Sequence, residues 1–473
     1  MSGTTAITPS VTFGGQVGSI ALSLLDTNFT QVATFLNNAN NYSNYLVDTG
    51  AANSIVVTTP TSVTATYTAG LTIAVKVIAA NTGASTVNVN SLGLKNILNP
   101  DGSALTNNQM TATSVVALVY DGTQFLLAGG GAIAPTSNYT GFKNRIINGA
   151  MVIDQRNAGA SVATSSGAQV YAVDRWQAVY SQVSKFTLQQ NAASVTPPTG
   201  FINYLGITSS SPYTVGSGEQ FNIRQAIEGL NVTDLGWGTA SAATVTLSFW
   251  VRSSLTGTFG GCLMNSAANR SYPFTFTISA ANTWEQKSVT VAGDTTGTWL
   301  TTNGIGVYVW FGLGVGSTLS ATAGAWSAGY YPSATGATSV VGTSGATFYI
   351  TGVQLEKGST ATSFDYRPYG TELQLAQRYY EKLPTGGYGA VGVRTTDWYG
   401  YVMWQVEKRA NPTCTLNGTI NIVGSVGDIN TQTPTGLDTA STKTIRIYRT
   451  GGAFTTQAGS FYISNYLEVS AEL

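Results

Sequence analysis

The sequence predicts a mainly β protein built from several domains, and three observations carry this prediction. The chain has 473 residues, and a domain usually takes about 100–200. Only 9% of the residues are charged, whereas 54 are glycines. Short runs of alternating apolar and polar residues recur between clusters of Gly, Ser, Thr and Asn, a pattern typical of strands and turns. The 43% of hydrophobic residues and the zero net charge indicate folded domains, because disorder needs low hydrophobicity and high net charge.

Residues 1–50 are predicted to form an arm followed by a short helix, Leu22 to Asn40. Apolar residues recur there at helical spacings and make one stripe: Leu22, Leu25, Phe29, Val32, Phe35 and Leu36. The stripe is close to the a/d spacing of a coiled coil. Two interpretations stay open, since the helix either docks on its own chain or associates with copies of itself.

Residues 51–131 are predicted to form a small β domain, followed by a linker at 132–141. Its expected strands are Ser54–Thr58, Leu71–Ala79, Ser85–Val89, Val115–Tyr120 and Gln124–Leu127. Asp121-Gly122 predicts a hairpin between the last two strands. The run Gly129-Gly130-Gly131 and Pro135 favour a flexible connection.

Residues 142–370 are predicted to form a large β-sandwich. Its expected strands are Arg145–Ile153, Val173–Tyr180, Lys185–Gln189, Gln220–Ile227, Thr244–Arg252, Phe274–Ile278, Gln286–Val291, Ile305–Phe311 and Thr347–Leu355. In Thr244–Arg252 the odd-numbered residues from Val245 to Val251 are apolar and are expected in the core. That alternation leaves Trp250 and Arg252 on the opposite face of the strand.

A short helix, residues 371–383, is expected to connect the sandwich to a C-terminal β domain, residues 384–473. Thr371 is the expected N-cap, with Gln374 completing a capping box. The helical stripe runs through Leu373, Ala376, Tyr380 and Leu383. Strands of the C-terminal domain are expected at Trp398–Val406, Thr444–Tyr448 and Phe461–Val469.

Composition argues against several classes of function. The chain has no histidine, so Ser-His-Asp triads, Cys-His pairs and HExxH zinc sites cannot occur. We expect no catalytic residues, no metal and no cofactor. Zero net charge argues against nucleic-acid binding, and the lack of a long apolar run argues against membrane insertion. Cys262 and Cys414 are expected in different domains and unpaired. The N-terminus does not resemble a signal peptide, so synthesis in a cytoplasm is expected.

Carboxylates keep one catalytic alternative open, that of a glycosidase with paired acids. The acids available for such a pair include Asp154, Asp174, Glu219, Glu228, Asp234, Glu285 and Glu356. The favoured interpretation is that they cap turns and solvate the surface.

Aromatic residues fit sugar binding better, because aromatic rings can stack on sugar faces while polar side chains bind the hydroxyls. The candidate ligand-binding residues are Trp237, Trp250, Arg252, Tyr308 and Trp310. Tyr308 and Trp310 are two apart and therefore share one face of a strand. The alternative for each candidate is burial in the core or at a subunit interface. Trp176 in DRW and Tyr366 in DYRPY are expected to be structural, with Asp–Arg pairs that hold a domain closure.

Several long phrases resemble a known family of proteins. FYITGVQLEKGSTATSFDYRPYGTELQLAQRYYEK resembles the end, and NRIINGAMVIDQR with DRWQAVY the opening, of a jelly-roll, carbohydrate-binding-like module of phage tail fibre and minor tail proteins. FNIRQAIEGLNVTDLGWGTASAATVTLSFWVRSSLTGTFGG and TWEQKSVTVAGDTTGTW are similar to the core of that module. LLDTNFTQVATFLNNA and VEKRANPTCTL resemble the N-terminal and C-terminal segments of such proteins.

The resemblance implies a jelly roll at 142–370 and a homotrimeric fibre in the virion. It further implies attachment to other phage tail or baseplate proteins through the N-terminal region, and distal contact with a host cell-surface glycan. It supplies no motif for the sugar-binding residues. Three functions stay open: a non-catalytic receptor-binding fibre, a fibre-borne polysaccharide hydrolase or deacetylase, and a purely architectural collar or baseplate fibre.

Overall fold

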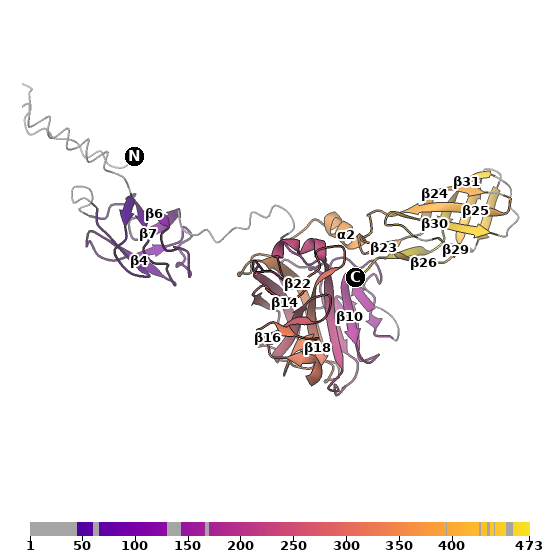
Figure 1. Ribbon diagram of the computed structural model, residues 1–473, viewed down its shortest axis with the longest axis horizontal. Coiled ribbons are helices and arrows are strands. Elements are labelled where there is room, and N and C mark those ends of the chain that lie inside the picture. Colours follow the sequence, from indigo (N-terminus) through magenta and orange to yellow (C-terminus); the bar gives the residue numbers. More distant parts are fainter. Residues whose placement is uncertain are drawn as a thin grey trace, which may run out of the picture. The chain divides into compact units, whose positions relative to one another are not determined.

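The structure, a computed structural model, divides the chain into two compact units, residues 1–138 and 139–473. It describes residues 45–59, 66–129, 143–165, 170–393, 395–424, 427–432, 436–438, 440–450 and 457–473. The predicted helix Leu22 to Asn40 and the predicted linker 132–141 lie outside the described residues. Among the described residues, no helix is both long and apolar enough to cross a membrane. The mainly β fold class is confirmed, since strands account for nearly all the regular structure (Figure 1).

The first unit contains one seven-stranded sheet with the order β1-β3-β6-β7-β5-β4-β2. The strands are β1 Tyr45–Val47, β2 Ser54–Val57, β3 Thr72–Lys76, β4 Ser85–Val89, β5 Lys95–Leu98, β6 Val115–Tyr120 and β7 Phe125–Gly129. Each predicted strand of this region overlaps an observed one, while β1 and β5 were not predicted. The predicted hairpin joins β6 to β7: the Asp121 carboxylate accepts hydrogen bonds from the backbone of Thr123 and Gln124, and Gly122 has φ +112°.

The second unit contains a sandwich of two antiparallel sheets (Figure 1). Sheet I has the order β20-β16-β15-β18-β13-β10-β9, and sheet II has the order β17-β14-β22-β12-β11-β8. The strands of sheet I are β9 Val170–Val173, β10 Trp176–Tyr180, β13 Gln220–Glu228, β15 Gly257–Met264, β16 Arg270–Ile278, β18 Ile305–Val315 and β20 Ser327–Ala328. Those of sheet II are β8 Val162–Ala163, β11 Phe186–Gln190, β12 Leu205–Ser209, β14 Val245–Ser253, β17 Glu285–Val291 and β22 Thr347–Lys357.

From β13 to β22 the chain crosses repeatedly between the two sheets, as in a jelly roll. Strands β13, β15, β16 and β18 belong to sheet I, whereas β14, β17 and β22 belong to sheet II. A small parallel pair, β19 Ser320–Ala321 and β21 Ser333–Ala334, follows β18. Four 3₁₀ turns complete the described part of the sandwich: Ala192–Ser194, Gly229–Asn231, Thr233–Leu235 and Ser317–Leu319.

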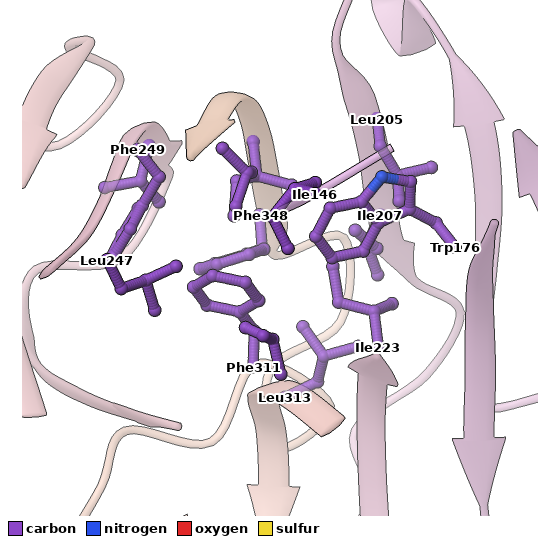
Figure 2. Close-up of a cluster of buried hydrophobic side chains, with 14 of the residues drawn as sticks. Ile146, Trp176, Leu205, Ile207, Ile223, Leu247, Phe249, Phe311, Leu313 and Phe348 are labelled. Carbon is purple, nitrogen blue, oxygen red and sulfur yellow. The ribbon is translucent and has the colours of Figure 1, made fainter. Parts of the chain in front are cut away.

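The core lies between the two sheets, and Figure 2 shows part of it. Leu247 and Phe249 come from sheet II and face Phe311 from sheet I, and the rings of Phe249 and Phe311 are 5.0 Å apart. Trp176 and Phe311 are fully enclosed. The predicted alternation in β14 is confirmed, because Val245, Leu247, Phe249 and Val251 are all buried in this core.

The predicted strand Arg145–Ile153 is wrong. This segment is buried, but side chains instead of a strand ladder satisfy much of its backbone. Asn144 bonds the backbone of Ile146, Val353 and Leu355. Asn148 adopts φ +57° and bonds the backbone of Ile153 in both directions.

Strands β12 and β15, in which glycines interrupt the apolar pattern, were not predicted, nor were the two-residue strands β8, β19, β20 and β21. The predicted strand Val173–Tyr180 is in fact the end of β9 and all of β10, joined by a turn at Asp174-Arg175.

The connecting helix is shorter than predicted. Helix α2 spans Tyr369–Gln377 and begins after Pro368, with no side-chain hydrogen bond at its N-cap. The predicted Thr371 capping box is therefore wrong. The carboxylate of Glu372 instead accepts hydrogen bonds from Arg367 and from the backbone of Asn148. The predicted helical stripe fails beyond Gln377, because Tyr380–Leu383 form strand β23.

The C-terminal part contains a three-stranded and a seven-stranded sheet. The three-stranded sheet comprises β23 Tyr380–Leu383, β32 Tyr466–Ser470 and β26 Thr413–Asn417. The seven-stranded sheet comprises β28 Gly427–Gln432, β27 Ile420–Gly424, β31 Gln457–Ile463, β24 Gly386–Val393, β25 Asp397–Met403, β30 Thr444–Thr450 and β29 Gly436–Leu437. One apolar cluster, including Trp398, Phe461 and Leu467, is shared between them. The predicted strand Phe461–Val469 is in fact two strands, which end and begin on either side of Ser464-Asn465.

Candidate functional site

The structure places the predicted ligand-binding residues at three separate positions of the sandwich. Tyr308 and Trp310 lie on β18 of sheet I, and Trp250 and Arg252 lie on β14 of sheet II. Trp237 lies in the connection between β13 and β14. The sequence shows which residues share a strand face, but it does not show which strands share a sheet.

Trp237 is a core residue of the sandwich. Its side chain is 8% exposed, and it belongs to the core cluster. The rings of Trp299 and Trp326 lie 4.7 and 5.4 Å from its ring and meet it edge to face. Its indole N–H donates to the carbonyl of Ala243. These contacts use both the polar and the apolar parts of the side chain.

Trp250 and Arg252 lie on a face of sheet II that other parts of the chain partly cover. Phe201 packs against Gly352, whose φ of +61° and lack of a side chain allow the approach. The rings of Phe364 and Tyr366 then pack on Phe201, at 5.1 and 5.5 Å. A Cβ on Gly352 would also lie 3.1 Å from Trp250. Trp250 thus borders an aromatic cluster that is only partly buried, since Tyr366 is 58% exposed.

Arg252 is hydrogen-bonded to the loop between β16 and β17. Its Nε donates to the carbonyl of Asn282 at 2.9 Å, and its guanidinium lies 5.5 Å from the ring of Tyr349. Neighbouring outward-facing residues of sheet II, including Thr351 and Gln354, are fully buried. Gln354 bonds Glu356, whose carboxylate holds the loop residue Thr362.

Tyr308 and Trp310 are brought together on the outer face of sheet I. Val307, Val309 and Phe311 point into the core, so Tyr308 and Trp310 face the other way. Their ring centroids are 5.8 Å apart. The predicted common face of these two residues is confirmed.

Arg224 completes this face, although it is not among the candidates predicted from the sequence. Arg224 pairs with Trp310 across β13 and β18. Its guanidinium lies 4.5 Å from the Tyr308 ring and 4.7 Å from the Trp310 ring, within the range of a cation–π contact. Its Nε donates to the side-chain oxygen of Gln177 at 2.8 Å. Tyr330 packs against the edge of Trp310 at 6.1 Å. We call Gln177, Arg224, Tyr308, Trp310 and Tyr330 the Arg224 face.

Three buried polar atoms on this side of sheet I have no hydrogen-bond partner among the described residues. They are Nε1 of Trp310, whose side chain is 1% exposed, and Oδ1 of Asn222 and Oγ of Ser333, both fully buried. Such a group costs about 1–3 kcal/mol. The Arg224 face therefore combines aromatic rings, a cation and polar atoms whose bonding is incomplete.

Part of the outer face of sheet I is closed by the chain itself. Ser333 on β21 rests against Gly260 and Gly312, where an added Cβ would lie 2.4 and 2.7 Å from the serine hydroxyl. The two glycines permit this close approach. Arg224, Tyr308 and Tyr330 keep partial exposure beside the covered area.

Each of the seven acids named as candidate catalytic groups is engaged in a turn contact or an ion pair. Asp154, Glu219, Glu285 and Glu356 accept hydrogen bonds from backbone N–H groups of nearby turns. Asp174, Glu228 and Asp234 pair with arginines. Within the described ranges, no group of three or more His, Cys, Asp or Glu side chains could hold a metal ion. Cys262 and Cys414 are both free thiols.

Trp176 of DRW is structural, as predicted, because it is fully buried and its indole N–H donates to the carbonyl of Asn148. Tyr366 of DYRPY is 58% exposed and packs on Phe201 and Phe364. The expected Asp–Arg pair within DRW is wrong, since Asp174 pairs with Arg156.

Arg175 stacks 3.6 Å from the ring centroid of Tyr379 and pairs with Glu472. Arg156 bridges Glu472 and Asp174 at 3.0 and 3.2 Å. We call this set of side chains the joint, because it ties the sandwich to the C-terminal end of the chain. Arg367 similarly bonds the backbone of Asn144 and Ile146 and so holds the opening segment of the sandwich.

No family model and no curated protein matches the chain. Among solved structures, it is similar to the enzymatically active domain of tailspike protein 4 of bacteriophage CBA120, with 11% identity over 46% of this chain and a TM-score of 0.25. The aligned part spans 22% of that tailspike chain. It is also similar to a CBM4 structure, with 16% identity over 45% of this chain and 98% of that chain at a TM-score of 0.22. A family 11 carbohydrate-binding module of Clostridium thermocellum, in complex with a mixed-linked tetrasaccharide, shares 10% identity over 43% of this chain and 100% of that chain at a TM-score of 0.22.

Proposed function

We propose that the chain is a non-catalytic, glycan-binding component of a phage tail fibre, and that the glycan docks on the Arg224 face. The observation that carries the choice of site is the position of Arg224 against the rings of Tyr308 and Trp310. A sugar could stack on the partly exposed ring of Tyr308 while its hydroxyls bond Gln177 and Arg224. Sites for small ligands usually combine aromatic walls with a few polar groups in this way.

The fibre role rests on the sequence resemblance to phage tail fibre and minor tail proteins. In this proposal the chain forms a homotrimer in the virion and attaches to other tail or baseplate proteins through residues 1–50. Sedimentation of the full chain at micromolar concentration tests the trimer, and a monomer would contradict it.

The hydrogen bonds and ion pairs of the seven candidate acids favour a binding protein over a hydrolase or deacetylase. A general acid or nucleophile needs an orientation toward the substrate, whereas the seven candidate acids are held by turns and arginines. Incubation of the full chain with host polysaccharide separates the two functions. Release of reducing ends or acetate would show catalysis and contradict this part of the proposal.

A glycan array with the full chain tests the binding role and its location. Tyr308→Ala should weaken binding of a captured glycan by about tenfold, which corresponds to the loss of one stacking contact. The matched control is Tyr401→Ala, because Tyr401 is a 52% exposed tyrosine on β25 of a different sheet. An equal loss of glycan binding in both variants would contradict the proposed position of the site. A wild-type chain that binds no glycan would favour the architectural alternative.

A further inference from the structure

The charge on the outer face of sheet I indicates the chemical class of the glycan, if the proposed function holds. We propose that the glycan is acidic, with a carboxylate or phosphate group on its repeating unit, and that the guanidinium of Arg224 binds this oxyanion. The hydrogen bonding of Arg224, its orientation and its surroundings all favour an anionic ligand.

Arg224 differs from most charged side chains of the sandwich because none of the ion pairs among the described residues includes it. The ion pairs formed within the sandwich are Arg145–Asp234, Arg156–Asp174, Arg270–Asp294, Lys287–Glu285, Lys357–Asp234 and Arg367–Asp365. Glu228, on the same strand as Arg224, pairs with Arg378. Tyr171 pairs with Gln177 across β9 and β10, and the guanidinium of Arg156 lies 4.4 Å from its ring. The nearby carboxylate of Glu472 is already shared by Arg156 and Arg175. The Arg224 face therefore carries a positive charge that the chain itself does not neutralise.

The guanidinium of Arg224 uses only one of its three nitrogen atoms in a hydrogen bond. Nε donates to Gln177, and the two terminal amino groups make no hydrogen bond within the described part of the chain. The rings of Tyr308 and Trp310 lie 4.5 and 4.7 Å from the guanidinium and restrict its movement. A guanidinium fork of this kind matches the two oxygens of a carboxylate or phosphate. Because the fork is already oriented, little side-chain entropy remains to be lost on binding.

The surroundings of Arg224 strengthen its attraction for an anion. Trp310, Tyr330 and Tyr308 restrict water on one side, and charge interactions are stronger where water is partly excluded. A neutral sugar would leave this cation unpaired in a contact area of low polarity. An oxyanion would satisfy it and could retain the stacking contact with Tyr308.

Binding of the full chain to acidic glycans and to their neutral derivatives tests the inference. The probes are polysialic acid, alginate and polygalacturonate with their carboxyl-reduced forms, and a glycerol-phosphate polymer with its phosphate-free glycosylglycerol counterpart. At least one acidic probe should bind, and removal of its charge should weaken binding by about tenfold or more, as expected for a charge-assisted contact. Arg224→Gln should weaken binding of that probe to the same extent, while Arg224→Lys should be intermediate. Raising the salt concentration should weaken wild-type binding more than Arg224→Gln binding.

The matched control is Lys185→Gln, which also removes one positive charge resting on a ring, 4.4 Å from the Tyr213 centroid and outside the Arg224 face. This variant should bind as the wild type does. Equal wild-type binding of acidic and neutral forms, or binding of neutral glycans alone, would overturn the inference while leaving the proposed glycan-binding function intact. Loss of binding in Arg252→Gln but not in Arg224→Gln would show that the glycan binds on sheet II, and would also overturn the inference that Arg224 binds the oxyanion. Failure to bind any glycan, charged or neutral, would refute the proposed function itself.

Discussion

The joint between the sandwich and the C-terminal end depends on one buried carboxylate. The side chain of Glu472 is 3% exposed and pairs with Arg156 and Arg175. In Glu472→Gln the charge disappears while the shape of the side chain remains. Arg156 keeps Asp174 as a partner, but Arg175, whose side chain is 2% exposed, loses its acid partner.

Leaving a buried charge without a partner lowers the free energy of unfolding by about 3–5 kcal/mol. For Glu472→Gln we expect a loss near the lower end of this range, because the amide oxygen can still accept a hydrogen bond. The measurement is denaturant unfolding of the full chain followed by tryptophan fluorescence. The change in free energy is obtained from the shift of the transition midpoint and its slope. Glu407→Gln is the control, since Glu407 and Lys443 form a pair 3.7 Å apart whose side chains are 56% and 70% exposed. It should change the free energy of unfolding by less than about 1 kcal/mol.

The double variant Arg175→Gln with Glu472→Gln adds a test of the mechanism. If the cost of Glu472→Gln comes from the unpaired charge of Arg175, removal of that charge should recover part of the stability. If Glu472→Gln and Glu407→Gln change the free energy of unfolding by equally small amounts, the prediction is wrong, because the joint then contributes no more stability than a surface ion pair.

Two further predictions concern the pH dependence and the packing of the sandwich. Burial raises the pKa of the Asp174 carboxyl from 3.8 to about 6, against the opposing effect of Arg156. The folded state therefore binds an additional proton between about pH 4 and pH 6, so this group's contribution to stability decreases as pH rises through that window and is constant above it. Unfolding curves from pH 4 to pH 7 should show this decrease, roughly 3 kcal/mol, in the wild type relative to Asp174→Asn; a difference independent of pH would contradict it. Gly352→Ala should destabilise the chain by roughly 1–3 kcal/mol, because φ is +61° and the new Cβ would lie 2.6 Å from Phe201. Gly370→Ala on α2, where nothing lies within 4 Å, should leave the melting temperature unchanged or raise it, and an equal loss in both variants would exclude the steric explanation.

The sequence predicted elements well where local pattern decides structure. The alternation in β14 and the Asp121-Gly122 hairpin both report short-range geometry, and both are confirmed. The pattern failed where distant residues decide the outcome. Arg145–Ile153 looks like a strand but is bonded by Asn144, Asn148 and Gln225 side chains. Helical spacing continued past Gln377, yet the next segment forms strand β23 and pairs with β32, Tyr380 with Ser470 and Leu383 with Leu467.

The candidate site shows the same division. Residue spacing correctly placed Tyr308 and Trp310 on one face, but it could not reveal that Trp250 and Arg252 lie on the other sheet. Arg224 was missed, although a signal was present: Asn222 and Arg224 alternate with the apolar Phe221 and Ile223, which indicates an outward-facing cation. Only the pairing of β13 with β18 brings that cation against Trp310.

A crystal structure of the full chain with an acidic oligosaccharide that it binds would show where and how the glycan docks. We expect a sugar ring stacked on Tyr308, with its oxyanion bonded by the terminal amino groups of Arg224. A sugar bound beside Trp250 on sheet II, or in contact with two converging carboxylates, would contradict it.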